Sequence, residues 1–205
     1  MRANSKDLYG WIIHPTIVKH AVQIAVIAVL TALSIGTNYA MISLYNVKLM
    51  DFIVFVGGFC FGPLAGAMIG VTSWVVYGSL NPLGFSFPVW LSTMFSEAIY
   101  GIAGAFVKRS LNSDGFDGFR NERVPLCLFF AFLGVLLTLI YDLITNIVFG
   151  YVSGWNILFA IVVGFVPFGV LHMASNALFF GLGCVPAINA VFQLVGGENY
   201  VISEK

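Results

Sequence analysis

The sequence predicts an all-α membrane protein, a single domain of six transmembrane helices over residues 1–205, and three observations support this prediction. Apolar residues make up 60% of the 205 residues, whereas charged residues make up only 9%. Soluble domains carry about 25% charged residues, so nine Lys/Arg and nine Asp/Glu cannot cover the surface of a water-soluble protein of this length. The mean hydropathy is +0.96, and several apolar runs reach the roughly 20 residues that a helix needs to cross a bilayer.

Four of the expected spans are long apolar runs, over residues 17–43, 88–107, 125–151 and 156–183. The run over 52–80 contains no charged residue and has Gly62-Pro63 near its middle. Because proline removes a backbone donor and clashes with the preceding turn, we expect two short spans there, 51–61 and 63–79. The stretch 187–195, beyond Pro186, is too short to cross the bilayer again, and we expect it to lie in the membrane interface.

The distribution of basic residues favours six spans with both termini in the cytoplasm. Lys and Arg gather in short cytoplasmic loops, and with six spans Lys48 is the only one of nine that falls outside. With five spans the loop over 108–124 would move to the exterior and the bias would disappear. We therefore expect a multi-pass protein of the cytoplasmic membrane, and the basic residues on the inner side are Arg2, Lys6, Lys19, Lys108, Arg109, Arg120, Arg123 and Lys205.

The balance of charges also excludes some classes of partner and site. The formal net charge is zero and no basic run exists, which excludes a disordered chain or a nucleic-acid-binding protein. Cys60, Cys127 and Cys184 are far apart in apolar surroundings, which favours inert thiols over disulfides or a metal site. We expect no cofactor and no metal.

The first span carries small residues on one face and polar residues on the other. Thr31, Ser34 and Asn38 cluster on the polar face. Helices in lipid associate through small residues, so the small face is either ordinary packing within the bundle or a docking face for another membrane helix. The small face is formed by Ala21, Ala25, Ala28 and Ala32.

Glycines in the next three spans indicate close packing of those helices. Gly58, Gly62, Gly66 and Gly70 recur every four residues, and Gly101 continues the pattern in the fourth span. Small residues let helix backbones approach closely in a membrane. We expect these helices to pack tightly against one another.

Two carboxylates lie at membrane depth, Glu97 near the middle of the fourth span and Asp142 in the outer part of the fifth. A carboxylate inside the bilayer costs at least about 2.5–3.5 kcal/mol on insertion scales, so each is expected to face the interior and to have a partner. Thr138 and Asn146 share the helical face of Asp142. We expect a functional rather than a structural role for both carboxylates.

Other polar and aromatic residues gather in the outer halves of the spans, which predicts a pocket that opens outward and can stack an aromatic ring. Lys48 and Asp51 flank the first outer loop, where they could also form a plain interfacial ion pair. His172 and Asn176 stack toward the cytoplasmic half, and a helix-to-helix hydrogen bond explains them as well as ligand contact does. The candidate substrate-binding residues are Asn38, Trp74, Tyr77, Asn81, Trp90, Glu97, Asp142, Asn146 and Trp155.

Five segments carry a resemblance to a known family. They are Leu49-Met50-Asp51-Phe52, Phe61-Gly62-Pro63-Leu64-Ala65-Gly66-Ala67, Asn81-Pro82-Leu83-Gly84-Phe85, Glu97-Ala98-Ile99-Tyr100-Gly101, and Asp142 with Asn146. From Lys19 to about Gly183, the sequence resembles the substrate-binding S components of energy-coupling factor (ECF) vitamin transporters.

The resemblance implies a six-helix membrane protein that binds a vitamin or related micronutrient from the outside with high affinity. It also implies three partners, a transmembrane coupling (T) subunit and two cytoplasmic ATPase subunits. The coupling subunit of the family docks on an Ala-x-x-x-Ala motif in the first helix, and Ala28-Val-Leu-Thr-Ala32 is the best match. The N-terminus Met1-Arg2-Ala3-Asn4 lacks the early His of the nickel and cobalt members. Two interior acids against one base favour a cationic or donor-rich ligand.

The main alternative is an integral-membrane enzyme that acts on lipid or peptide with Glu97, Asp142 and His172. An enzyme needs such groups within reach of one reacting centre, whereas we expect Asp142 in the outer half and His172 in the inner half. The sequence also lacks His-Glu-x-x-His and Gly-x-Ser-x-Gly motifs. A purely structural protein would leave the two carboxylates unexplained. We therefore predict a binding and transport subunit that is not an enzyme.

Overall fold

The computed structural model describes residues 15–81, 84–112 and 122–194, and every regular element in these ranges is a helix. The predicted all-α class is confirmed. The N-terminal basic residues Arg2 and Lys6, Arg120 and the tail residue Lys205 lie outside the described residues. The elements are α1 (Pro15–Ala40), α2 (Met50–Phe61), α3 (Pro63–Ser79), α4 (Phe87–Leu111), α6 (Arg123–Ser153), α7 (Ile157–Gly164), the π-helix η2 (Phe165–Gly169) and α8 (Val170–Leu194).

The predicted break between the second and third helices is confirmed at Gly62-Pro63. Gly62 has a φ of +98° and stands between α2 and α3, and its N–H still donates to the Gly58 carbonyl at 2.9 Å. Only glycine adopts such a φ without strain. Pro63 opens α3 at a position where its missing N–H would have no helical partner. These two residues therefore turn the chain between two helices with no connecting loop.

The connection between α6 and α7 is three residues long, 154–156, and is capped on both sides. Gly154 adopts a left-handed conformation with a φ of 68°, and the Trp155 N–H donates to the Gly150 carbonyl at 2.9 Å, which closes the end of α6. On the other side the Asn156 side chain accepts a hydrogen bond from the Phe159 N–H at 3.2 Å and caps the start of α7.

The last segment differs from the prediction in two ways. The expected single span 156–183 is interrupted by η2, in which Val166 has non-helical backbone angles, φ −116° and ψ 112°. The helix also does not end near 183, because α8 continues through Pro186 to Leu194. Cys184 and Ile188 on this continuation are fully buried. Packing of this apolar face thus keeps the chain helical past the proline as far as Leu194, and the interfacial position of 187–195 stays a prediction.

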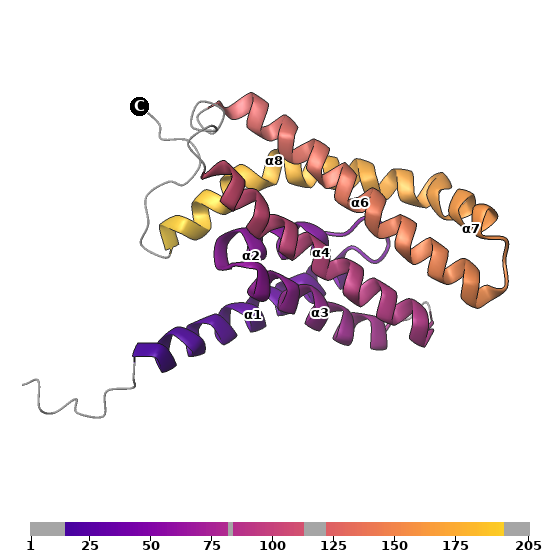
Figure 1. Ribbon diagram of the computed structural model, residues 1–205, viewed down its shortest axis with the longest axis horizontal. Helices are drawn as coiled ribbons and strands as arrows, with labels where there is room; N and C mark the ends of the chain where they lie inside the picture. Colours follow the sequence, from indigo (N-terminus) through magenta and orange to yellow (C-terminus); the bar gives the residue numbers. More distant parts are fainter. Residues whose placement is uncertain (1–14, 82–83, 113–121, 195–205) are drawn as a thin grey trace, which may run out of the picture.

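Figure 1 shows that the start of α1, the end of α4, the start of α6 and the end of α8 lie at the same end of the molecule. The contacts are most extensive between α3 and α4, between α6 and α8, and between α2 and α4. Lys108, Arg109 and Arg123 lie at this end, and we call it the basic end. The opposite end, formed by the end of α6, η2 and the loop between α1 and α2, is called the cavity end.

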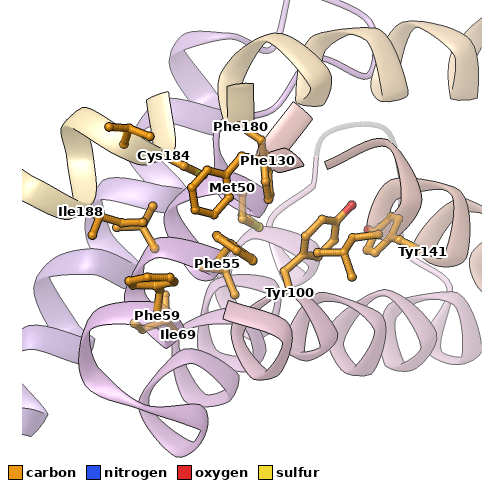
Figure 2. Close-up of a cluster of buried hydrophobic side chains, with 14 of the residues drawn as sticks. Met50, Phe55, Phe59, Ile69, Tyr100, Phe130, Tyr141, Phe180, Cys184 and Ile188 are labelled. Atoms are coloured by element: carbon orange, nitrogen blue, oxygen red, sulfur yellow. The ribbon is translucent and has the colours of Figure 1, made fainter. Parts of the chain in front are cut away.

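Aromatic rings from four helices form the centre of the core (Figure 2). Phe55 of α2 lies 5.0 Å from Phe180 of α8 and 6.0 Å from Phe130 of α6, measured between ring centroids. Tyr100 of α4 lies 6.2 Å from Phe180. All four side chains are fully buried. This cluster joins the α2–α4 side of the bundle to the α6–α8 side.

Glycines bring the backbones of α2, α3 and α4 into direct contact, as the sequence predicts. A Cβ atom added to Gly58 would lie 1.8 Å from the Gly101 carbonyl oxygen, and one added to Gly101 would lie 2.3 Å from the Gly66 carbonyl carbon. No larger residue fits at these positions without moving a helix. Gly62 is different, since a Cβ there would meet no atom within 4 Å and its role is in the turn.

The polar face of α1 is turned inward and its small face outward. Ser34 and Asn38 are buried, and the Thr31 and Thr72 hydroxyl oxygens lie 2.8 Å apart between α1 and α3. The alanine stripe is exposed throughout, so packing within this bundle does not account for it. The exposed stripe is Ala21, Ala25, Ala28 and Ala32.

Three helical segments of the described chain are long and apolar enough to cross a membrane: Ala21–Ala40, Arg123–Ser153 and Ile157–Leu194. Their outward faces carry large apolar side chains, among them Phe132 at 67% and Leu182 at 73% exposure. Lipid is the solvent in which such a surface is stable. The chain is therefore an integral membrane protein by composition, by helix length and by surface.

Candidate functional site

The cavity end contains three adjoining cavities that meet at Trp74. The largest, called the main cavity, has a volume of about 470 Å³, and the loop cavity beside it has about 270 Å³. A third, small cavity of about 110 Å³ lies between α3 and the start of α4. The main cavity is lined by Tyr45, Asn46, Lys48, Trp74, Val89, Thr93, Tyr141, Asp142, Thr145, Asn146, Phe149, Gly164 and Phe168.

Seven of the nine sequence-predicted site residues line these cavities. Trp74, Asp142 and Asn146 line the main cavity. The loop cavity is lined by Asn38, Tyr77 and Asn81, together with Trp74, and the small cavity by Trp90. The exceptions are Glu97 and Trp155. Trp155 is 43% exposed at the α6–α7 turn, where it packs on Phe149 and Phe159 and lines none of the three.

Glu97 lies behind the cavity wall and acts on it through Trp74. Its side chain is fully buried, and its Oε2 accepts a hydrogen bond from the Trp74 indole N–H at 3.1 Å. The Trp74 carbonyl accepts from the Trp90 indole N–H at 2.9 Å. The Tyr77 ring packs edge-on against Trp74 with centroids 5.5 Å apart. These contacts fix the orientation of the one ring that all three cavities share.

His172 lies between two carboxylates, which overturns the depth expected for it. Its Nε2 is 2.6 Å from Asp51 Oδ2 and its Nδ1 is 3.0 Å from Asp142 Oδ1. Asp142 and His172 therefore lie at the same depth, and the prediction that they lie in different halves is wrong. The observed helix runs from 157 to 194 rather than from 156 to 183, so His172 lies in the half nearer the cavity end.

Asp51 is likewise not an interfacial residue. It is the second residue of α2 but is fully buried, and its Oδ2 also accepts from the Asn176 amide at 2.6 Å. Asn176 donates in addition to the Thr138 hydroxyl at 2.7 Å. The Tyr100 hydroxyl reaches the same Thr138 oxygen at 3.0 Å. The network thus joins α2, α4, α6 and α8 in the centre of the bundle.

The charge of the Asp51–His172–Asp142 group follows from its hydrogen bonds. Each of the two bonds needs one proton, whether the proton sits on the imidazole or on a carboxylate. Two protons shared by two carboxylates and an imidazole give a net charge of −1 in every arrangement. The group therefore places one negative charge beside the main cavity. Asp142 is the member of the group that lines this cavity.

Lys48 provides a positive charge at the same cavity. Its ammonium nitrogen lies 5.2 Å from the centroid of the Trp74 ring and 5.6 Å from that of Tyr141. Such cation–π contacts hold a cation over the face of a ring. Lys48 lines both the main and the loop cavity, so its side chain lies on the boundary between them.

Two glycines on the other wall make room for the polar side chains of α6. A Cβ on Gly164 would lie 2.1 Å from the Asn146 amide oxygen, and a Cβ on Gly169 would lie 3.2 Å from Asp142 Oδ2. Gly164 directly precedes η2 and Gly169 is its last residue, so this irregular segment lies directly against the polar face of α6.

The loop between α1 and α2 covers the main cavity from the side of η2. The Asn46 amide donates to the Phe168 carbonyl at 3.1 Å, across 122 residues of sequence. The rings of Tyr45 and Phe168 lie 6.2 Å apart between centroids. Both contacts tie the loop to η2 at the point where the two line the cavity together.

Sequence reasoning missed several residues of the main cavity. Tyr141 and Thr145 adjoin Asp142 in sequence and on the helix, so the periodicity of α6 was a signal that could have found them. Asn46 and Phe168 belong to the loop and to η2, and no periodic pattern marks either one. Among the residues that the structure describes, no group of three or more His, Cys, Asp or Glu is arranged to hold a metal ion.

Comparison with known proteins identifies the family. The family model for the substrate-specific component of ECF transporters matches residues 22–182. No curated protein and no solved structure matches the chain. The matched segment contains the α1–α2 loop, α2, α3, α4, α6, α7 and η2, and with them all the residues that line the main cavity. The chain therefore belongs to the family of ECF transporter substrate-specific components, a family of transport subunits rather than of enzymes.

Proposed function

We propose that the chain is an S component that binds a vitamin or related micronutrient from the outside of the cytoplasmic membrane. The main cavity is the observation that carries this proposal. Its volume of about 470 Å³ lies in the range of small-molecule sites, and its wall combines aromatic rings with a few polar groups, as such sites do. The site residues are those that line the main and loop cavities, with Glu97 in a supporting position behind Trp74.

The proposed topology has six spans, with the basic end in the cytoplasm and the cavity end outside. Lys108, Arg109 and Arg123 support it, because basic residues remain on the cytoplasmic side. α2 has 12 residues and is about 18 Å long, shorter than a bilayer core of about 30 Å. In this topology α2 crosses only part of the membrane, and its nine buried residues keep it inside the bundle.

The coupling subunit is proposed to dock on α1, and the two ATPases act through it. The exposed alanine stripe supports this docking, since small residues permit the close approach of another membrane helix. An apolar groove of about 330 Å³ runs beside the stripe, lined by α1, Phe61 and the last residues of α8. A partner helix that packs on the stripe would also contact this groove along one side.

The enzyme alternative gains no support from the short distances around His172. Both ring nitrogens already face carboxylate oxygens, and the side chain is fully buried. An imidazole in that position has no nitrogen left for a substrate. Glu97 is equally enclosed and bonded to Trp74. His172 and Glu97 are therefore occupied by contacts with the protein, and of the three residues proposed for acid–base chemistry Asp142 alone lines the main cavity.

Native mass spectrometry of the gently purified protein, followed by thermal unfolding with a panel of vitamins, tests the proposal. A ligand that binds only the folded state raises its apparent stability by mass action. We expect one co-purified micronutrient, and the same compound should raise the unfolding temperature. Reconstitution with a coupling subunit and its ATPases should then give ATP-dependent uptake of that compound. Turnover of a lipid or peptide without any vitamin binding would contradict the proposal.

A further inference from the structure

The wall of the main cavity carries two polar groups of opposite charge, and each has hydrogen-bonding capacity that the protein does not use. One is the carboxylate of Asp142 on α6, and the other is the ammonium group of Lys48 at the end of the α1–α2 loop. Aromatic rings separate them, since Lys48 lies over Trp74 and Tyr141. These two groups determine which hydrogen-bonding groups the two ends of a ligand must carry.

The Asp142 end accepts hydrogen bonds. Asp142 is 5% exposed, its Oδ1 faces His172, and its Oδ2 has no hydrogen-bond partner among the described residues. The proton shared with His172 lies on the Oδ1 side, so Oδ2 is an acceptor wherever that proton sits. The Tyr141 hydroxyl, on a side chain that is 3% exposed, also lacks a partner in the described chain. Polar atoms this deeply buried require partners. Both atoms are covered in this structure, so a ligand N–H reaches them once the side chains at the cavity wall move aside.

The Lys48 end donates hydrogen bonds. An ammonium group has three donors and no acceptor, and within the described residues its contacts are those with the two rings. Lys48 is only half-buried and borders two cavities. A ligand oxyanion within reach of this group would form a charge-assisted hydrogen bond, which is stronger than one between neutral groups.

The wall also carries charges of both signs. The Asp51–His172–Asp142 group carries −1 and Lys48 carries +1. A ligand that is only cationic would meet the carboxylate but would also meet Lys48, and like charges oppose each other in a partly dry site. A ligand with donors at one end and an oxyanion at the other satisfies both groups. Phe149 and Phe168 provide further apolar wall for a ring between these ends.

We infer that the ligand of the main cavity is a ring compound with an N–H donor edge that faces Asp142 and Tyr141 and an oxyanion group, carboxylate or phosphate, that faces Lys48. This inference rests on the proposed function and narrows it. The sequence favours a cationic or donor-rich ligand. Of these two, the inference retains the donor-rich ligand, and it adds an oxyanion group to it.

Pairs of probes that differ only in the oxyanion test the inference. The pairs are biotin with biotin methyl ester, pyridoxamine 5′-phosphate with pyridoxamine, thiamine monophosphate with thiamine, and riboflavin 5′-phosphate with riboflavin. The full-length protein in lipid nanodiscs is titrated with each probe by calorimetry. We expect the oxyanion member of the binding pair to bind about tenfold to hundredfold more tightly. The pair that shows this difference in affinity indicates whether the site binds a carboxylate or a phosphate.

Two lysine variants assign the difference to one side chain. Lys48→Met should make the two members of the binding pair equal in affinity. Lys108→Met is the matched control, because Lys108 also lies over a ring, Phe192 at 4.9 Å, but at the basic end. We expect the affinity ratio of the pair to stay at its wild-type value in Lys108→Met.

Variants at the other end should act on both members of a pair alike. Asp142→Asn is expected to weaken both by the same factor, about tenfold. Because Asp142 also bonds His172, Tyr141→Phe serves as the second variant, since it removes only the unpartnered hydroxyl and keeps the ring. It should weaken both members about threefold to tenfold.

The possible failures can be told apart. Equal binding of both members by the wild type, or an unchanged ratio in Lys48→Met, would overturn the inference and leave the S-component proposal intact. Binding of thiamine or riboflavin more tightly than the corresponding phosphate would do the same. If no probe binds and no small molecule co-purifies, the proposed function fails and the inference fails with it.

Discussion

The two sides of this bundle use glycine for opposite purposes. Between α2, α3 and α4, glycines remove side chains so that backbones touch, as at Gly58 and Gly101. Between α6 and η2, glycines leave space that polar side chains fill, as Gly164 does for Asn146. The first arrangement gives close apolar packing of three helices. The second places hydrogen-bonding groups against the backbone at the edge of a cavity.

This difference separates the part of the molecule that sets the fold from the part that faces a ligand. A backbone contact cannot be adjusted by a change of rotamer, whereas an amide beside a glycine can. The polar network around His172 lies between the two sides and joins them, since its members come from α2, α4, α6 and α8. Four substitutions test the comparison.

The largest effect on stability is expected for His172→Leu. The substitution removes the donor that Asp51 and Asp142 share and leaves two buried carboxylates, which typically costs about 3–5 kcal/mol. Thermal unfolding in detergent should show a large decrease in the midpoint. The double variant with Asp51→Asn should recover part of the loss, because one of the two carboxylates is then absent. An unchanged midpoint in the single variant would show that the network contributes nothing to stability.

The glycine contact of α2–α3–α4 should break in Gly101→Ala. The new methyl group would lie 2.3 Å from the Gly66 carbonyl carbon, and backbone cannot yield as a side chain does. Overpacking of this kind costs about 1–3 kcal/mol. The matched control is Gly36→Ala on α1, where an added Cβ atom would meet no packed neighbour within 4 Å. The control should be neutral or up to about 1 kcal/mol more stable, because alanine favours the helix. The same unfolding midpoint for both variants would refute the backbone contact.

A smaller effect on stability, but a clear one on binding, is expected for Gly164→Ala. The added methyl group would displace the Asn146 amide, which is the flexible end of a side chain. We expect a loss of about fivefold to tenfold in affinity for the micronutrient identified in the thermal-shift panel, the value of one hydrogen bond. In an Asn146→Ala background the same substitution should add no further loss. An additional loss there would mean that Asn146 does not transmit the effect.

The smallest effect on the isolated protein is expected for Ala28→Leu. Ala28 is exposed on α1, and exposed substitutions usually change stability by less than about 0.5 kcal/mol. Ligand affinity should also stay unchanged, whereas co-purification with the coupling subunit should be lost. Ala40→Leu is the control, since Ala40 is exposed on the same helix but lies off the stripe. If both variants co-purify equally with the coupling subunit, the alanine stripe is not its docking site.

The sequence predicts much of this fold because its signals are local. The Gly62-Pro63 turn, the inward polar face of α1 and the close approach of Gly58 and Gly101 each follow from residue type and spacing. Proline, glycine and helical periodicity act within a few residues, so one sequence suffices to read them.

The site was predicted only in part, because its central contacts depend on helix register across the bundle. Counting residues from assumed span ends places His172 too deep. The break in η2, where Val166 precedes Pro167 and is pushed out of the helical region, was not used as a signal, and the continuation of α8 through Pro186 to Leu194 was not expected. Asp51 was expected to flank the first outer loop, with an interfacial ion pair to Lys48 as one alternative, yet it lies fully buried in the first turn of α2. Glu97 was correctly expected to be buried with a partner, but it supports Trp74 rather than lining the cavity.

The contact between Asn46 and Phe168 has a consequence for the kinetics of ligand exchange. On the η2 side the loop over the main cavity is held by one hydrogen bond of 3.1 Å and one ring contact. A hydrogen bond of this kind is worth about 0.5–1.5 kcal/mol, so its rupture slows opening by only about twofold to tenfold. For a ligand that enters past this loop, the on-rate is then slowed by no more than about tenfold, and the residence time depends mainly on the ligand's own contacts in the cavity.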